Sequence, residues 1–210
     1  INRIDGELAS ATPNAASPGR NDGKVTITGD DVAVGFNVGL MVQATDATRI
    51  GLAYRSKVDY KLKGKTKIEG SGFSVFSGQK YNASLDLNTP ESAELSVTHQ
   101  LDDQWTLYAG STWTRWSRLE SIDVINQGVP ALLGGANGPV GRISEVQEWR
   151  DTWYHAIGAA YKVNNQWTLR TGLAMDQSPV SNSHRSPRIP TGDRKILSLG
   201  AAYSPTDDIT

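Results

Sequence analysis

The sequence predicts an all-β protein, an antiparallel transmembrane β-barrel with short periplasmic turns and long extracellular loops. Apolar and polar residues alternate along most of the chain, which is the pattern of strands with one apolar and one polar face. Two nearly identical phrases, residues 103–107 and 165–169, each place a Trp directly after a tight polar turn. A Trp at the mouth of a strand is typical of the membrane–water interface, because its amphipathic ring prefers the headgroup level.

The composition is compatible with this class and excludes others. The chain has 210 residues, a net charge of −1 and a mean hydropathy of −0.41. It contains no apolar run of about 20 residues, which excludes a helical membrane protein. No basic stripe is available to neutralise phosphates, so no nucleic-acid partner is expected. Without cysteine there are no disulfides or thiolate metal sites, and no cofactor is expected.

The strands follow in order along the chain. A partial strand begins at residue 1, and the first complete one is expected near 31–45. After the turn at 46–48, apolar residues alternate with charged ones as far as Leu62, and a charged face of that length cannot be a soluble core. Five further strands are expected near 83–101, 104–119, 148–163, 166–177 and 193–204. Pro90 interrupts one of them, and we expect a bulge or kink there that resets the register, because Glu91 would otherwise point into lipid.

The connections between these strands alternate in length. The turns at 46–48, 102–104, 164–166 and 204–208 are short, whereas the segments near 9–30, 64–82, 120–147 and 177–192 are long and rich in Gly, Ser and Pro. Short turns at one end and long loops at the other are typical of outer-membrane barrels, whose long loops lie outside the cell. The sequence therefore predicts a location in the bacterial outer membrane.

Four phrases resemble the FadL family of outer-membrane transporters for long-chain fatty acids, some of which carry aromatic hydrocarbons. They lie at 29–39, 53–56, 87–91 and 178–194, in the family's order. The resemblance implies a fourteen-stranded barrel with an N-terminal hatch in its lumen, and residues 1–210 are expected to be a central portion without the hatch or the last strands. It also implies diffusive transport of a fatty acid through an internal hydrophobic pocket. Uptake of aromatic hydrocarbons and a non-transporting structural or adhesive barrel are the alternatives.

The resemblance further implies where basic side chains meet the ligand's carboxylate. One family position falls on Arg3. The second lands near Glu145 and is not matched, so Arg142 or Arg150 could take its place. Arg3 could instead belong to a luminal salt-bridge network, since barrel interiors commonly pair their charges.

Aromatic residues are the other predicted ligand contacts. Phe73 and Phe76, in a long loop, are placed to offer an apolar groove, or else they anchor the loop. Trp116 has the opposite strand parity from Trp105 and Trp113, so it should face the lumen, where it either lines the pocket or packs on a loop.

An enzyme is not expected. The chain has no Gly-x-Ser-x-Gly elbow, and its three histidines, at positions 99, 155 and 184, show no metal-ligand spacing.

Overall fold

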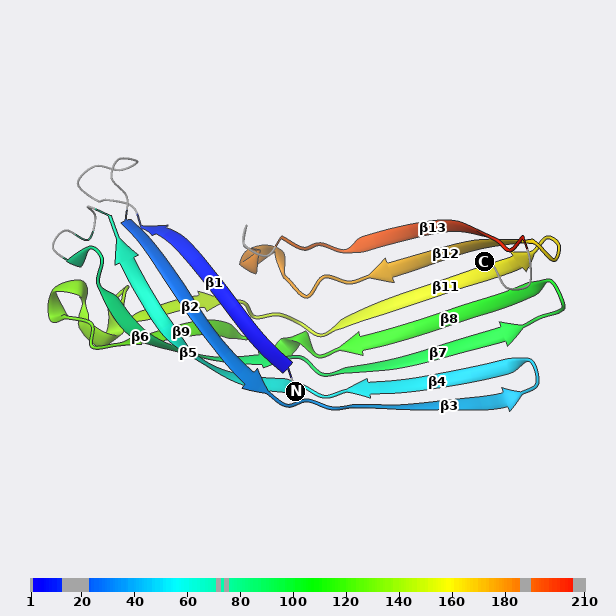
Figure 1. Ribbon diagram of the computed structural model, residues 1–210, viewed down its shortest axis with the longest axis horizontal. Coiled ribbons are helices and arrows are strands. Elements are labelled where there is room, and N and C mark those ends of the chain that lie inside the picture. Colours follow the sequence, from blue (N-terminus) through cyan, green and yellow to red (C-terminus); the bar gives the residue numbers. More distant parts are fainter. Residues whose placement is uncertain (1, 13–22, 71–72, 74–75, 186–189, 206–210) are drawn as a thin grey trace. The chain divides into compact units, whose positions relative to one another are not determined.

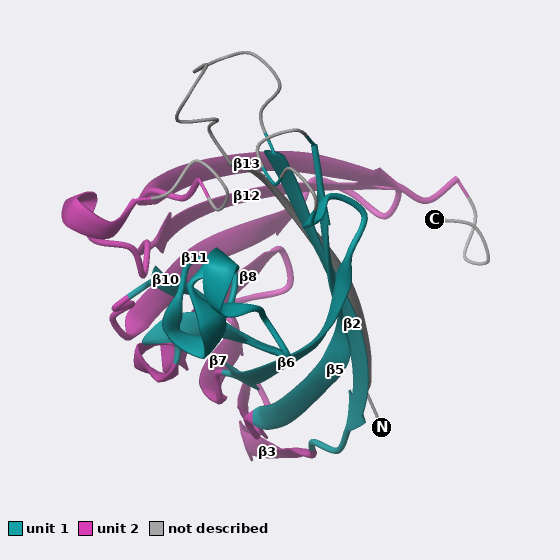
Figure 2. Cartoon of the chain, turned by 90° about the vertical axis from the view of Figure 1, so that its left-hand side faces the viewer, with its two compact units in different colours: residues 1–35, 58–89, 119–147 teal, residues 36–57, 90–118, 148–210 magenta. Residues whose placement is uncertain are grey.

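The computed structural model describes residues 2–12, 23–70, 73, 76–185 and 190–205, and side chains from residue 23 onward. Within these ranges the chain forms thirteen strands in two antiparallel sheets (Figure 1). The sheets belong to two compact units (Figure 2), one of residues Ile1–Gly35, Val58–Thr89 and Leu119–Gln147, the other of Phe36–Lys57, Pro90–Arg118 and Glu148–Thr210. None of the described helices is long and apolar enough to cross a membrane.

The seven-stranded sheet has the spatial order β13-β12-β11-β8-β7-β4-β3. Its strands are β3 (Asn37–Thr45), β4 (Thr48–Arg55), β7 (Ser92–Gln100), β8 (Trp105–Thr114), β11 (Thr152–Lys162), β12 (Trp167–Asp176) and β13 (Arg194–Tyr203). The hairpins β3–β4, β7–β8 and β11–β12 close through turns of a few residues at the same end of the sheet (Figure 1). These are three of the four short turns that the sequence predicted; the fourth, at 204–208, lies partly outside the described residues.

The predicted alternation is confirmed by the register of this sheet. Leu52 pairs with Leu40 on one side and with Leu95 on the other, and Leu173 pairs with Ile157 and Leu197. Directly paired residues point to the same face, so these side chains form one apolar face. They are exposed within this chain, Leu197 to 67%. The opposite face carries Gly, Ser, Thr, Tyr and charged side chains.

The six-stranded sheet has the order β1-β2-β5-β6-β9-β10. Its strands are β1 (Asn2–Thr12), β2 (Gly23–Ala33), β5 (Val58–Glu69), β6 (Lys80–Thr89), β9 (Ser121–Gln127) and β10 (Arg142–Val146). One face buries a core of Val25, Ile68, Phe73, Tyr81 and Val140, and the other carries a row of exposed or half-exposed lysines at 61, 63, 65 and 67.

Two predictions about this region were wrong. The long loops expected near 9–30 and 120–147 contain strand pairs, β1–β2 and β9–β10. Val58, Tyr60 and Leu62, expected on a lipid-facing strand, are buried against Ala33, Leu85 and Leu87. The physical reason is that the continuous strand predicted from Ile50 to Leu62 is broken at Ser56–Lys57, so its second half belongs to the other sheet, which has its own core.

The strand predicted near 83–101 is also divided. It breaks at Pro90–Glu91, as expected, but this break does not reset the register. Val58 pairs with Thr89 before the break, and Arg55 pairs with Ser92 after it. The two pairs are three residues apart in both strands, so the register is kept. The register changes at the neighbouring pair of strands instead. Asp30 pairs with Lys63, and Asn37 pairs with Arg55. These two pairs are seven residues apart on one side and eight on the other, so the register shifts by one residue.

The repeated Trp phrases are explained by the turns that precede them. Asp102 Oδ1 accepts hydrogen bonds from the backbone N–H groups of Gln104 (2.8 Å) and Trp105 (2.7 Å). Asn164 Oδ1 accepts the equivalent pair from Gln166 and Trp167, both at 2.9 Å. A short Asx side chain that satisfies two backbone donors fixes the turn, so each strand begins at its Trp.

Each of these tryptophans packs on a tyrosine of the neighbouring strand. The ring centroids are 4.7 Å apart for Trp105 and Tyr161, and 4.6 Å for Trp167 and Tyr203. Both pairs stand at the short-turn end of the sheet. This is the aromatic belt expected at a membrane–water interface.

Candidate functional site

A hollow of about 530 Å³ lies on the polar face of the seven-stranded sheet, over β8, β11, β12 and β13. Glycine supplies much of its floor, at positions 110, 158, 172 and 200; we call it the glycine groove. Gly158 and Gly172 are directly paired. Because glycines on adjacent strands carry no side chain, the sheet surface is locally depressed here.

Added side chains would close the glycine groove. A Cβ on Gly172 would stand 2.9 Å from Ser198 Oγ, and one on Gly158 would stand 3.1 Å from the carbonyl oxygen of Thr171. Tyr108, which pairs with Gly158, borders the groove, as does Tyr154. The groove therefore combines a smooth floor with aromatic edges, a surface suited to a flat or elongated apolar molecule.

Two charged side chains border the glycine groove. Arg170 lies on β12, paired with Ala160 on one side and Gly200 on the other, and Glu94 lies on β7. Arg170 is exposed and takes part in none of the ion pairs found among the described residues. A guanidinium beside small neighbours retains donors for a carboxylate or another anion.

A cluster of aromatic and basic side chains lies at the opposite end of the strands from the short turns. Trp116 packs edge-on against Trp149, with ring centroids 5.1 Å apart. Arg150, next along the chain, donates from Nε to the carbonyl of Ser178 (3.3 Å), and its backbone N–H bonds to the carbonyl of Pro179 (3.0 Å). The indole N–H of Trp149 is buried without a protein acceptor. The structure thus brings Trp116 and Arg150 into the same region.

The strand that predicted the orientation of Trp116 is shorter than expected. β8 ends at Thr114, and Trp116 begins a 3-10 helix, η2 (Trp116–Arg118). Strand alternation therefore does not govern this side chain, whose ring is placed by its packing on Trp149.

The remaining predicted site residues lie in the six-stranded unit. Phe73 is buried in its core, 7% exposed, and its ring covers Gly23; Phe76 packs against the same core. The backbone of Arg3 lies in β1 opposite Val32, and its side chain is outside the described part of the structure. A ligand role for these three residues stays a prediction.

Arg142, the alternative head-group cation, is engaged in β10 by an ion pair with Asp123 (3.3 Å). The hydroxyl of Ser121, 2.6 Å from the Asp123 carboxylate, holds the pKa of that group below its ordinary value, and Arg142 adds to the effect.

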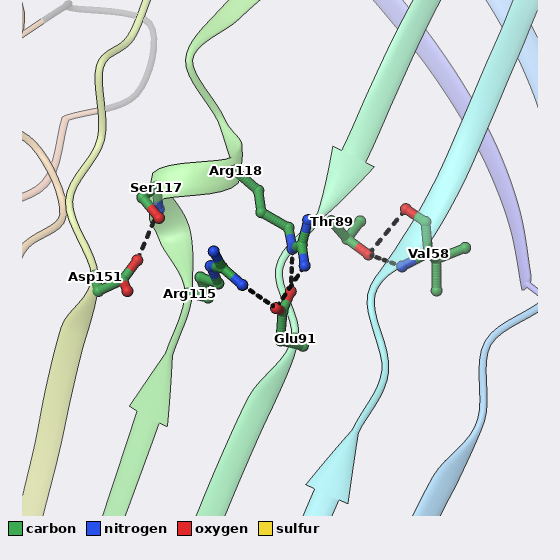
Figure 3. A network of polar contacts seen from close by, with 7 residues as sticks. All are labelled: Val58, Thr89, Glu91, Arg115, Ser117, Arg118 and Asp151. Carbon is green, nitrogen blue, oxygen red and sulfur yellow. Dashed lines mark hydrogen bonds and ion pairs between the residues drawn. The ribbon is translucent and has the colours of Figure 1, made fainter.

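A buried carboxylate organises the break between β6 and β7. Glu91 lies between these strands, and its side chain is 7% exposed. Arg118 donates to it through Nε and through Nη2 (2.7 Å), and Arg115 donates through Nη1 at 3.3 Å (Figure 3). The hydrogen bonds from Arg118 are the largest cause that lowers the pKa of Glu91 to about 2. Glu91 was expected to point into lipid unless a bulge reset the register. Its charge is instead compensated by the two arginines.

Sequence reasoning did not single out Arg170 and the groove glycines as a site. The available signal was that small residues recur at inward positions of several strands that pair with one another. No group of three or more His, Asp or Glu side chains in the described residues is arranged to hold a metal ion.

Comparisons with known proteins agree with this architecture. The family model described as "Outer membrane protein transport protein (OMPP1/FadL/TodX)" matches residues 1–210. The chain is 29% identical over 215 residues to the long-chain fatty acid transport protein of Escherichia coli O6:H1, covering 96% of this chain and 46% of that protein. It is 33% identical over 216 residues to outer membrane protein P1 of Haemophilus influenzae, covering 98% and 44%. The chain thus spans less than half the length of these curated relatives.

Solved structures give the same result. The crystal structure of a Pseudomonas aeruginosa FadL homologue superposes with a TM-score of 0.81 at 29% identity, over 96% of this chain and 50% of that one. The toluene transporter TodX of P. putida has a TM-score of 0.57 at 22% identity, over 97% and 44%, which is a likeness of fold alone.

Proposed function

The chain belongs to the outer membrane protein transport family, and on that premise we propose that it forms part of the wall of a channel that carries long-chain fatty acids across the outer membrane by diffusion. The glycine groove is the observation that carries the proposal. It is a hollow on the face turned away from the apolar, lipid-facing side chains, and its volume of about 530 Å³ is within the range of small-molecule sites, about 300–1,000 Å³.

The chemistry of the glycine groove suits an amphiphile. The floor of glycines and the rings of Tyr108 and Tyr154 offer apolar contact for a hydrocarbon tail. Arg170, at the border, offers a cation for the carboxylate. The tail would lie across β8, β11 and β12 while the head group stays at β12.

Arg3, Trp116 and Arg150 are proposed as further contacts along the route. The Trp116–Trp149 pair and Arg150 together present aromatic surface and a cation at the strand ends away from the short turns. Phe73 and Phe76 would contribute apolar surface only if ligand reaches the core in which they pack.

An aromatic hydrocarbon is the second candidate substrate. The tyrosines that border the glycine groove favour it, since flat rings stack on aromatic side chains. Such a ligand has no charge, so it would gain nothing from Arg170. The arginine therefore distinguishes the two substrates.

The test compares Arg170→Gln with Arg49→Gln in the full-length protein. Arg49 is a matched control because it is also an exposed arginine of this sheet, but it lies beside a short turn and donates to Gln43. We expect Arg170→Gln to weaken oleate binding by about 1.5–3 kcal/mol, the range for a hydrogen bond to a charged group. Binding of methyl oleate or toluene should be unchanged, and Arg49→Gln should behave as wild type with every ligand.

A second variant tests the glycine groove itself. Gly172→Val places a branched side chain against Ser198, and we expect it to slow uptake of oleate into proteoliposomes without loss of the folded, heat-modifiable band. Oleate binding that is equal in wild type, Arg170→Gln and Gly172→Val would contradict the proposal. Toluene uptake blocked by Gly172→Val, with no binding of oleate by any variant, would assign the groove to aromatic hydrocarbons.

A further inference from the structure

The apolar face of the seven-stranded sheet has a hollow of its own. It measures about 470 Å³, and its wall is made of Leu40, Leu52, Leu95, Trp113 and Trp153 around the small side chains of Ala93 and Ser111. We call it the outer hollow. Register explains it: Ala93 pairs with Trp113 and Ser111 with Leu95, so small residues alternate with large ones on adjacent strands. Its lining is almost entirely apolar and it faces away from the glycine groove.

A basic cluster stands directly beyond the outer hollow on the same face. Arg115 follows Trp113 by two residues, just beyond the end of β8, and its backbone N–H donates to the carbonyl of Glu91 (3.0 Å), while Glu91 precedes Ala93 by two residues on the neighbouring chain segment. Two residues of strand correspond to about 7 Å. The cluster therefore lies about one headgroup's height from the edge of the hollow.

Arg115 is the more exposed basic side chain of the cluster. Both Arg115 and Arg118 donate to the Glu91 carboxylate (Figure 3). Arg115 is 48% exposed, against 7% for Glu91, and only its Nη1 reaches the carboxylate. A nearby acidic group, Asp151, accepts the backbone N–H of Ser117 at 3.0 Å on the other side of β8 (Figure 3). Arg115 thus retains donors for a second anion.

Topology places this face in the extracellular leaflet. The outer hollow and the cluster lie at the end of the strands opposite the short turns at 46–47 and 101–104, and short turns of outer-membrane barrels are periplasmic. The flat packing of His155 on Trp153, with ring centroids 5.6 Å apart, adds amphipathic rings at the same level. The lipid of that leaflet in the bacterial outer membrane is lipopolysaccharide, whose phosphates stand directly above its acyl chains.

We propose that the outer hollow and Arg115 bind one lipopolysaccharide molecule of the outer leaflet, with an acyl chain in the hollow and a lipid A phosphate on Arg115. Acyl chains are attracted by the apolar lining, and the phosphate by charge-assisted hydrogen bonds. Glu91 holds Arg115 through Nη1 and leaves the other guanidinium donors of Arg115 for the phosphate. This site lies on the opposite face from the glycine groove and does not depend on what the channel carries.

The experiment uses the full-length protein in detergent, titrated with rough lipopolysaccharide or with phosphatidylglycerol and read by native mass spectrometry. Arg115→Gln keeps the Glu91–Arg118 pair, and Ala93→Phe fills the outer hollow. We expect Arg115→Gln to lower the affinity for lipopolysaccharide by about fivefold, the factor that corresponds to one basic residue near an anionic lipid surface. Ala93→Phe should lower the affinity as well, because it removes the space for the acyl chain. Arg49→Gln, at the short-turn end, serves as the matched control, and heat-modifiability reports folding of every variant.

Asp151→Asn provides a test in the opposite direction. It removes the acidic group beside the cluster, so lipopolysaccharide should bind more tightly. Three results would overturn the proposal: equal affinity of wild type, Arg115→Gln and Arg49→Gln; no effect of Ala93→Phe in a folded protein; or phosphatidylglycerol that binds as tightly as lipopolysaccharide and shows the same loss in Arg115→Gln.

Discussion

Replacing Glu91 by glutamine tests whether the break between β6 and β7 is stabilised by its buried ion pairs. In the wild type, Arg118 donates twice to the carboxylate and Arg115 once, at 3.3 Å. Hydrogen bonds to a charged group contribute about 1.5–3 kcal/mol. Glutamine keeps one acceptor oxygen but turns an amide N–H₂ toward two guanidinium groups. We therefore expect Glu91→Gln to lower the free energy of unfolding by about 2 kcal/mol.

The assay is urea unfolding of the full-length protein in lipid vesicles, followed by tryptophan fluorescence. The midpoint should fall while the slope with urea stays constant, because the surface exposed on unfolding is unchanged. Glu69→Gln is the matched control: Glu69 forms an exposed ion pair with Lys67 at 2.6 Å, and exposed pairs contribute little. A midpoint for Glu91→Gln equal to that of Glu69→Gln would refute the reasoning.

The same ion pairs predict a pH dependence. The pKa of Glu91 is lowered from 4.5 to about 2, chiefly by Arg118. A carboxyl group whose pKa is lower in the folded state stabilises the protein fully above its unfolded pKa, and this stabilisation is lost as the pH falls. Wild-type stability should therefore decrease between pH 4.5 and about 2 by more than that of Glu91→Gln. Parallel curves for the two proteins would show that Glu91 is not the titrating group.

Three further outcomes are expected. Asp102→Ala removes the acceptor of two turn hydrogen bonds and should cost about 1 kcal/mol in urea unfolding, whereas no change would mean that the turn is held by backbone bonds alone. Arg3→Ala should weaken fatty-acid binding in calorimetry by about 1.5–3 kcal/mol, with little further loss for the methyl ester; wild-type affinity would assign Arg3 to a luminal charge network. A cysteine at Thr106 should react with a water-soluble thiol reagent and one at Leu107 should not, and equal labelling would contradict the assignment of the two faces.

The faces of the membrane sheet could be predicted from the sequence because period-two alternation depends only on strand geometry. Leu52, Leu95 and Leu173 occupy apolar positions of this alternation, and the register places each of them opposite an apolar residue of the adjacent strand. The Trp phrases were equally readable, since each turn and its Trp are adjacent in the sequence. Membership of the family followed from phrases in a fixed order, which the family model confirms.

The division into two sheets could not be predicted from alternation. Tyr54, Ser56 and Val58 keep the period across the break, so the pattern itself does not end there. The strand ends because of tertiary contacts. The backbone N–H of Ser56 donates to the carbonyl of Phe36, and the backbone N–H of Phe36 donates to the Ser56 hydroxyl, both at 2.9 Å. Only Pro90 marked a break by residue type.

The candidate site could be predicted only in part, because its residues are readable from the sequence but their pairing across strands is not. Glycine recurs at alternate positions of several strands, but a groove exists only where glycines of adjacent strands fall in register, as Gly158 and Gly172 do. That pairing is set by the connections between strands. The same register places Arg170 between the small residues Ala160 and Gly200, and this leaves its guanidinium group accessible to a ligand.

The two Asx turns have a consequence for how such walls are assembled. Each hairpin contains, within a few consecutive residues, the acceptor that closes its turn and the ring that sets its depth, and it borrows only a tyrosine from the adjoining strand. A hairpin of this kind is a module that carries its own turn acceptor and its own Trp, and the hairpin of β11 and β12 also supplies Tyr161, on which Trp105 of the preceding hairpin packs. Widening a barrel two strands at a time then requires no new chemistry at the periplasmic rim, only one more copy of the same short phrase.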